Sequence, residues 1–314
     1  KNISLTISGW TSAYALPFNF YNGSVVVYND EIHIMNGTNH YAFNGTSWRK
    51  VSTLPYTHYG RSAVVYNDEI HMIYKNDHYA FNGSSWRNAS TLPYTYAGNS
   101  AVVYNGEIHI LGGSATTASD NRTKHYAFNG TSWREVSVLP YRFNNSAVVY
   151  NNEIHILGGY NSGSSTGQTN HYKFNGTSWN KVSTLPYNFY NNYAVVYNDE
   201  IHILGGNTNH YGFNGTSWNK VSTLPYNLDG SAAVVYNGKI HILGGYNTRT
   251  NHYMSIAELP QLIGTSVAIY QNPSNTSGTY ATNFISGVPI TGENNKFPSG
   301  FDDVYYIDDS GNVE

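Results

Sequence analysis

Histidine is the residue type that first suggests chemistry in this chain. There are 13 histidines among 314 residues, and an imidazole can bind a metal ion or move a proton near neutral pH. Twelve of them recur at two fixed places of a repeated segment: His33, His71, His109, His155, His202 and His241 at the first, and His40, His78, His125, His171, His210 and His252 at the second. A metal site needs ligands that converge on one point, whereas one histidine at the same place in every repeat is typical of a structural hydrogen bond. We therefore expect hydrogen bonds between neighbouring strands, and no metal or other cofactor.

Carboxylates show the same regularity. A glutamate precedes the first histidine in five repeats, and Lys239 replaces it in the sixth: Glu31, Glu69, Glu107, Glu153 and Glu200. A glycosidase needs two carboxylates at one site, and only Asp229 stands in a variable position. The polar candidates for acid–base chemistry outside the repeat pattern are therefore His58, Arg61, Arg142 and Asp229. No phosphate-binding glycine motif and no nucleophile motif is present.

Composition narrows the classes of partner. The formal net charge is -3 and only 11% of the residues are charged, which disfavours nucleic acid because phosphate binding requires clustered lysine and arginine. No run of 18 apolar residues occurs, so we expect no membrane insertion. The chain contains 30 tyrosines, which predicts a surface rich in hydrogen-bonding groups. It begins at Lys1 without a methionine or a signal-like segment, and we expect it to be a processed product or part of a longer protein.

These residues belong to six near-copies of one unit. One copy runs from Ser62 to Pro93, and the period of about 40 residues predicts a β-propeller. Within this copy the pattern predicts four short strands, namely 62–66, 69–73, 78–81 and 86–92, which would form one antiparallel blade. The dipeptide Asn67-Asp68 predicts a two-residue hairpin between the first two strands. Tryptophan begins the fourth strand of each copy: Trp10, Trp48, Trp86, Trp133, Trp179 and Trp218.

A second turn follows each third strand and starts with Asn-Gly-Thr or Asn-Gly-Ser, at Asn44, Asn82, Asn129, Asn175 and Asn214. The same triplet is an acceptor for N-glycosylation in secreted eukaryotic proteins. Because the triplet serves every repeat, we favour the turn.

The repeats resemble the kelch family in three features: a double glycine after the second strand, a tyrosine in the third and a tryptophan in the fourth. The double glycines are Gly112-Gly113, Gly158-Gly159, Gly205-Gly206 and Gly244-Gly245. The resemblance covers residues 10–258 and implies an all-β, kelch-type β-propeller. Blades one and two have Asn36-Gly37 and Tyr74-Lys75 instead, so we expect a different local turn there. Some kelch enzymes are copper oxidases with a cysteine-modified tyrosine, and the absence of cysteine excludes that chemistry.

The number of blades depends on the two ends of the chain. The sixth repeat lacks its tryptophan strand, while residues 10–16 resemble such a strand with no blade before it. We expect the N-terminal strand to close a six-bladed ring over residues 1–258, leaving residues 259–314 as a small C-terminal β appendage. The alternative is a seventh blade built from residues 10–16, 266–270 and 304–307.

The loops between blades share one face of a propeller and differ among the copies, whereas the hairpins on the other face are uniform. Binding residues usually occupy loops on a rigid scaffold, although neutral drift would also produce variable loops. Exposed aromatic rings favour recognition. The predicted ligand-binding residues are Phe20, Tyr21, His58, Tyr59, Arg61, Tyr96, Arg142, Phe143, Phe189, Tyr190 and Asp229.

Two functions follow from this surface. The first is a non-catalytic module that binds a glycan or a protein. The array is similar in style to kelch arrays of bacterial surface and phage structural proteins, which implies an extracellular, cell-surface or virion location and a C-terminal segment that joins a larger assembly. The second is a small kelch enzyme similar to the six-bladed sialic-acid mutarotases, with an acid–base pair drawn from the polar candidates.

Overall fold

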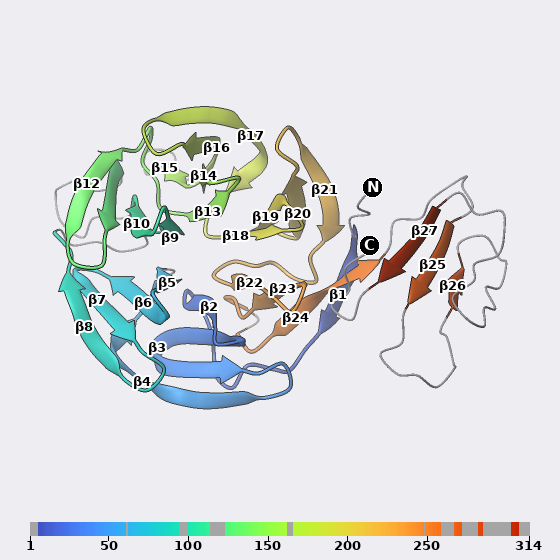
Figure 1. Cartoon of the computed structure of the whole chain (residues 1–314), viewed down its shortest axis with the longest axis horizontal. Coiled ribbons are helices and arrows are strands. Elements are labelled where there is room, and N and C mark those ends of the chain that lie inside the picture. The colour runs from blue at the N-terminus through green and yellow to red at the C-terminus, as the bar shows by residue number, and fades with distance from the viewer. Residues whose placement is uncertain are drawn as a thin grey trace. The chain divides into compact units, whose positions relative to one another are not determined.

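The computed structural model describes residues 6–60, 62–93, 100–113, 123–161, 166–247 and 249–258, and the strands 267–271, 282–284 and 303–307. Six sheets stand in a ring around a central axis, so the fold is the predicted six-bladed β-propeller (Figure 1). No helix in this described part is long and apolar enough to cross a bilayer.

The inner half of each blade is a tight hairpin. The innermost strands are apolar and β-branched, which suits strands that pack against neighbours on both faces: β2 (Ser24–Tyr28), β5 (Ala63–Tyr66), β9 (Ser100–Tyr104), β13 (Ser146–Tyr150), β18 (Tyr193–Tyr197) and β22 (Ala232–Tyr236). The second strands are β6 (Glu69–Tyr74), β10 (Glu107–Leu111), β14 (Glu153–Leu157), β19 (Glu200–Gly205), β23 (Lys239–Leu243) and, in blade one, the first part of β3 (Glu31–Phe43).

The outer half of each blade contains the third and fourth strands. The third strands are β7 (Asp77–Phe81), β11 (Lys124–Phe128), β16 (Thr166–Phe174), β20 (Asn209–Phe213), β24 (His252–Glu258) and the second part of β3. The fourth strands are β4 (Trp48–His58), β8 (Trp86–Thr91), β12 (Trp133–Val138), β17 (Trp179–Phe189), β21 (Trp218–Thr223) and β1 (Thr6–Ser12). Blade four has an additional short strand, β15 (Tyr160–Asn161), beside β16.

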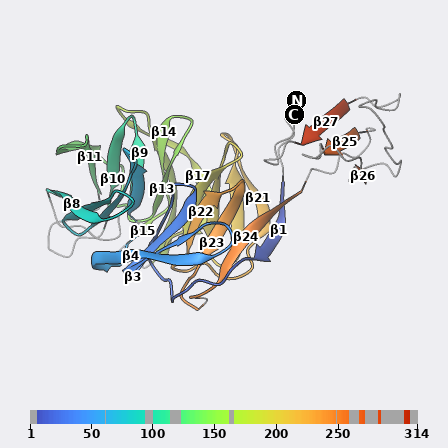
Figure 2. The same ribbon diagram turned by 60° about the horizontal axis from the view of Figure 1, so that its bottom comes forward.

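The ring closes by the predicted route. The sixth sheet has the order β1-β24-β23-β22, so the N-terminal strand supplies the outer edge of the last blade (Figure 2). Trp10 confirms this placement, because its Nε1 donates to Ser222 Oγ of blade five at 3.0 Å, as the other blade tryptophans do to the blade before them. The seven-bladed alternative is wrong, since the strand it needed at residues 10–16 already belongs to blade six.

Backbone geometry explains the uniform hairpins. Asn67 and Asp68 both have positive φ (48° and 58°), as a type I′ turn requires, and asparagine, aspartate and glycine tolerate that region best. In the second turn, the side-chain oxygen of Asn44 accepts from the amides of Thr46 and Ser47 at 3.0 and 2.9 Å. The same Asn-Gly-Thr/Ser arrangement occurs in blades two to five, so the predicted turn role is confirmed.

The departures in blades one and two also have a local form. In blade one, β3 continues through the place of the double glycine, and Gly37 there has φ 60°. In blade two, β6 and β7 are joined by a tight turn in which Lys75 has φ 56°.

The repeated histidines form hydrogen bonds between neighbouring strands of a blade, as predicted, and a tryptophan of the next blade joins the same relay. His33 Nδ1 lies 2.8 Å from His40 Nε2, and His40 Nδ1 lies 2.8 Å from Ser52 Oγ. Trp86 of the next blade donates its Nε1 to the same Ser52 oxygen at 2.9 Å. This relay recurs in blades two to five. The rings are buried, and each relay bond pairs polar groups in the interior, while Nε2 of His33, His71, His109 and His155 has no hydrogen-bond partner.

The chain divides into two compact units, Gly9–Ile256 and a second unit of Lys1–Ser8 with Ala257–Glu314. In the second unit, β25 (Val267–Gln271) lies between β26 (Thr282–Phe284) and β27 (Asp303–Ile307). β25 pairs with β27 in parallel, which differs from the all-antiparallel arrangement of the blades.

Candidate functional site

The linkers between blades carry the predicted site, and the structure divides their aromatic residues into two groups. Three predicted ligand-binding residues are wrong as surface residues, because Phe20, Phe143 and Phe189 have no exposed side-chain surface. Each stands four residues after the leucine of a Leu-Pro pair, and we call this place in the repeat the wedge position. Its side chain packs into the core between adjacent blades.

The double glycines explain why the wedge position is buried. Gly113 donates its amide to the carbonyl of Phe143 at 2.6 Å, and Gly159 does the same to Phe189 at 2.8 Å. A Cβ on Gly112 would lie 1.9 Å from the Phe143 carbonyl oxygen. Glycine lets the second strand of one blade contact the backbone of the next linker, and this contact holds the aromatic ring in the interior.

His58 occupies the wedge position of the linker before blade two and is also fully buried. Its Nε2 lies 2.9 Å from Ser24 Oγ, and its ring packs edge-on to Tyr74. Burial lowers the pKa of His58 to about 4, so the ring is neutral at neutral pH. The prediction of an accessible His58 is therefore wrong, and substrate cannot reach this imidazole.

The remaining predicted residues have different positions. Tyr59 and Tyr190 expose 55% and 39% of their surface, and Arg142 and Asp229 are also exposed, while Tyr21 is half-buried. Arg61 and Tyr96 lie outside the described residues. In every described linker, a buried wedge residue is thus followed by a more exposed residue, and in the linker before blade four the preceding Arg142 is exposed as well.

Three consecutive linkers join at one arc of this face, around blades five, six and one. Asn191 donates its carboxamide to the Asp229 carboxylate. Gly230 donates its amide to the carbonyl of Asn191 at 3.4 Å, and Asn22 donates to the carbonyl of Gly230 at 2.9 Å. These bonds fix the Asp229 backbone between its two neighbouring linkers.

Two tyrosine rings pair beside the Asp229 linker. Tyr246 donates its amide to the Asp229 carbonyl at 2.8 Å, and its ring lies 5.6 Å from that of Tyr21 with an interplanar angle of 63°. Tyr246 is 53% exposed. We call Tyr21, Tyr190, Asn191, Asp229 and Tyr246 the tyrosine rim.

The sequence predictions missed Tyr246 and Asn191. Tyr246 directly follows the double glycine of blade six, in the loop between that blade's second and third strands rather than in a linker between blades. The role of Asn191 depends on a contact with Asp229 in a linker 38 residues away, which the sequence alone does not indicate.

Tyr193 links blades five and one close to the rim. It replaces the small residue that begins most inner strands, and its hydroxyl donates to the Gly23 carbonyl of blade one at 2.9 Å. This bond reaches from blade five past blade six, where the equivalent residue is the small Ala232. Tyr193 therefore ties the inner strands of blades five and one together two residues after Asn191 of the rim.

The exposed groups suit the recognition of a polar ligand with an apolar face. Tyrosine rings offer apolar contact together with a hydroxyl, and Asn191 and Asp229 add a carboxamide and a carboxylate. Among the described residues, no cluster of three or more histidines and carboxylates could hold a metal ion.

Comparison with known proteins supports the fold. No protein-family model matches the chain, and no curated protein matches it. A solved structure titled "Structure of YjhT" is similar, with a TM-score of 0.63, 15% sequence identity, and coverage of 77% of this chain and 95% of that chain. At that identity the similarity establishes the propeller fold alone, since one fold supports many functions.

Proposed function

We propose that this chain is a non-catalytic recognition module of the kelch-repeat type that binds a glycan through the tyrosine rim. The observation that carries the proposal is the exposure of Tyr190 and Tyr246 beside the hydrogen-bonded pair Asn191–Asp229. Exposed rings on one arc of a rigid scaffold are unfavourable in water and become favourable when a ligand covers them.

Sugar chemistry fits these groups. The C–H face of a pyranose ring packs on a tyrosine ring, while its hydroxyl groups both donate and accept hydrogen bonds. Asp229 accepts and Asn191 can do both, so the rim matches the hydroxyl pattern of a sugar. The buried wedge residues hold the backbone beneath the rim, which reduces the entropy lost on binding.

The mutarotase-like alternative has weaker support. It required an acid–base pair, and His58, the titratable partner suggested for Asp229, is buried between blades one and two. We also propose the kelch assignment itself, on the double glycines and their contacts with the next linker. An extracellular, cell-surface or virion location and assembly through residues 259–314 remain predictions.

The test is a glycan array followed by titration of the best glycan. We expect Tyr246→Ala and Asp229→Asn each to weaken binding at least tenfold, because each removes a group that contacts the sugar. Val138→Ala is the matched control, since Val138 is 64% exposed on the outer strand of blade three, and it should bind as the unmodified chain does.

Three outcomes would overturn the proposal. Glycan binding that survives both rim substitutions would move the site elsewhere. Catalysed mutarotation of a sugar that is lost in Asp229→Asn would make the chain an enzyme. A pull-down in which a protein binds the rim while no glycan does would show that the ligand is a protein and not a glycan.

A further inference from the structure

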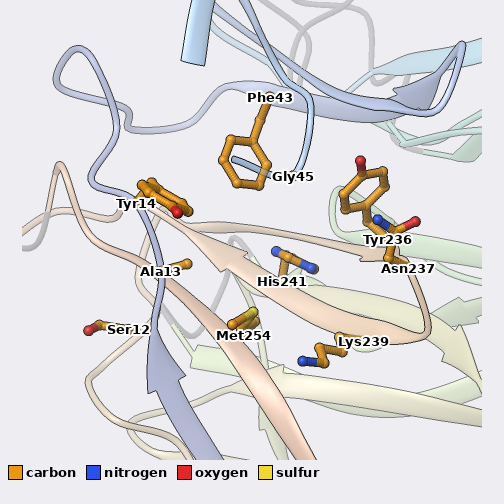
Figure 3. Close-up of a pocket in the computed structure, with 10 residues that line it drawn as sticks. All are labelled: Ser12, Ala13, Tyr14, Phe43, Gly45, Tyr236, Asn237, Lys239, His241 and Met254. Atoms are coloured by element: carbon orange, nitrogen blue, oxygen red, sulfur yellow. The ribbon is translucent and has the colours of Figure 1, made fainter. Parts of the chain in front are cut away.

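A cavity of about 540 Å³ lies between blades six and one, where the ring closes. Its walls include the rings of Tyr14, Phe43, Tyr236 and His241, with Met254 and Lys239 beside them (Figure 3). It opens among the uniform hairpins, since Gly45 and Asn237 of two such turns also line it. It is thus on the opposite side of the propeller from the tyrosine rim. Its volume falls within the range of small-molecule sites, about 300–1,000 Å³.

The other blades provide an internal comparison. Between blades two and three, Tyr66, His71 and Phe128 stand where Tyr236, His241 and Phe43 stand at the closure, yet the cavity there measures only about 70 Å³. The repeat itself therefore does not produce the large cavity. It depends on residues that differ at the closure.

An ion pair distinguishes the two places. Glu69 and Arg87 pair across the small cavity, and both line it. At the closure the corresponding residues are Lys239 and Thr11, which cannot form that pair. Ala89 also lines the small cavity where Ala13 lines the large one, so the short side chain at this position does not account for the difference in volume.

The charge at one position of the cavity wall is also reversed, because Lys239 stands where blade two has Glu69. Lys239 forms no ion pair within the described residues, whereas the glutamates of blades one to four each pair with an arginine or lysine. The other titratable side chain considered in the cavity wall, His241, is neutral, because burial lowers its pKa to about 3. Lys239 is therefore the one charged side chain among the described residues that line this space, beside aromatic and apolar groups and the neutral polar side chains of Ser12 and Asn237.

We infer that this closure cavity binds a small organic acid with an aromatic body and a single carboxylate. The aromatic body packs against Tyr14, Phe43 and Met254, and the carboxylate pairs with Lys239 in place of the missing glutamate–arginine interaction. A single cation matches a singly charged carboxylate better than a doubly charged phosphate ester, which proteins usually bind with several donors.

The experiment titrates the full-length chain with phenylacetate, 3-phenylpropionate and 2-naphthylacetate, followed by ligand-observed NMR and calorimetry. We expect at least one acid to bind and its neutral amide to bind at least tenfold more weakly. Lys239→Met should remove that preference for the acid. Thr11→Arg combined with Lys239→Glu rebuilds the ion pair of blade two and should abolish binding of both acid and amide.

Thr11→Arg and Lys239→Glu introduce the residues that blade two carries at the same positions, and Lys239→Met removes one exposed charge. We therefore expect all three substitutions to leave the chain folded. Circular dichroism and thermal unfolding check this. If none of the three acids binds, or if binding survives the rebuilt ion pair in a folded variant, the proposal is wrong. Tyr246→Ala serves as the control for the other face: it should leave acid binding unchanged, so the two proposed sites succeed or fail independently.

Discussion

At the scale of single residues, Phe189 and Tyr190 show how sharply the environment changes along a linker. Phe189 has no exposed surface, whereas its neighbour Tyr190 is 39% exposed. Both are aromatic, and the linker pattern places them side by side in the chain. The burial of Phe189 stabilises the junction of blades four and five, while Tyr190 remains available to a ligand.

We expect Phe189→Ala to lower the free energy of unfolding by about 3–5 kcal/mol, because it leaves a cavity between two blades. Tyr190→Ala should change it by less than about 0.5 kcal/mol, as is usual for an exposed side chain. Urea unfolding at pH 7 measures both. Equal effects of the two substitutions would contradict the assignment of Phe189 to the core.

At the scale of elements, the contact between a double glycine and the next linker determines how adjacent blades meet. Gly112 and Gly37 have nearly the same φ, 61° and 60°. A Cβ on Gly112 would meet the Phe143 carbonyl, while a Cβ on Gly37 would meet nothing within 4 Å. Substitutions at these two glycines therefore separate the stability lost through backbone conformation from the stability lost through interblade contact.

Gly37→Ala should cost only the penalty for a left-handed alanine, about 1–2 kcal/mol. Gly112→Ala should cost at least twice as much, because the linker that holds Phe143 must also move. Thermal and urea unfolding of both variants give the comparison. A Gly112→Ala variant no less stable than Gly37→Ala would show that the linker contact contributes little.

At the scale of the whole molecule, the ring buries a neutral histidine network. Burial is the largest cause that lowers the pKa of each of the thirteen histidines, to about 3 or 4. An unfolded histidine has a pKa near 6.5. Below that pH the unfolded chain binds more protons than the folded one, so acid favours unfolding.

We therefore expect the free energy of unfolding to be nearly constant from pH 8 to 7 and to fall steeply below pH 6.5. The fall should continue towards pH 4, because the folded histidines resist protonation down to their lowered pKa values. Urea midpoints measured at half-unit steps of pH test this. A midpoint that stays constant between pH 7 and 5 would mean that the histidines bind protons as readily in the folded ring as in the unfolded chain.

The sequence by itself determined the strands, the hairpins, the six blades and the closure by the N-terminal strand. These depend on local properties: the tolerance of Asn-Asp and Asn-Gly for positive φ, the alternation of side chains, and one tryptophan in each fourth strand. The structural role of the repeated histidines also followed from their regular spacing.

Only the tertiary structure decided which linker rings are buried, which ones gather around Asp229, and where the ring leaves a cavity. Exposure depends on how closely the neighbouring blade approaches, and that approach is set by residues about 30 to 40 positions away, such as Gly112 for Phe143. The closure cavity joins residues from both ends of the ring, Tyr14 and Lys239. The sequence predicts the closure that brings these residues into one blade, but the space left between their side chains depends on packing that no local pattern of residues can reveal.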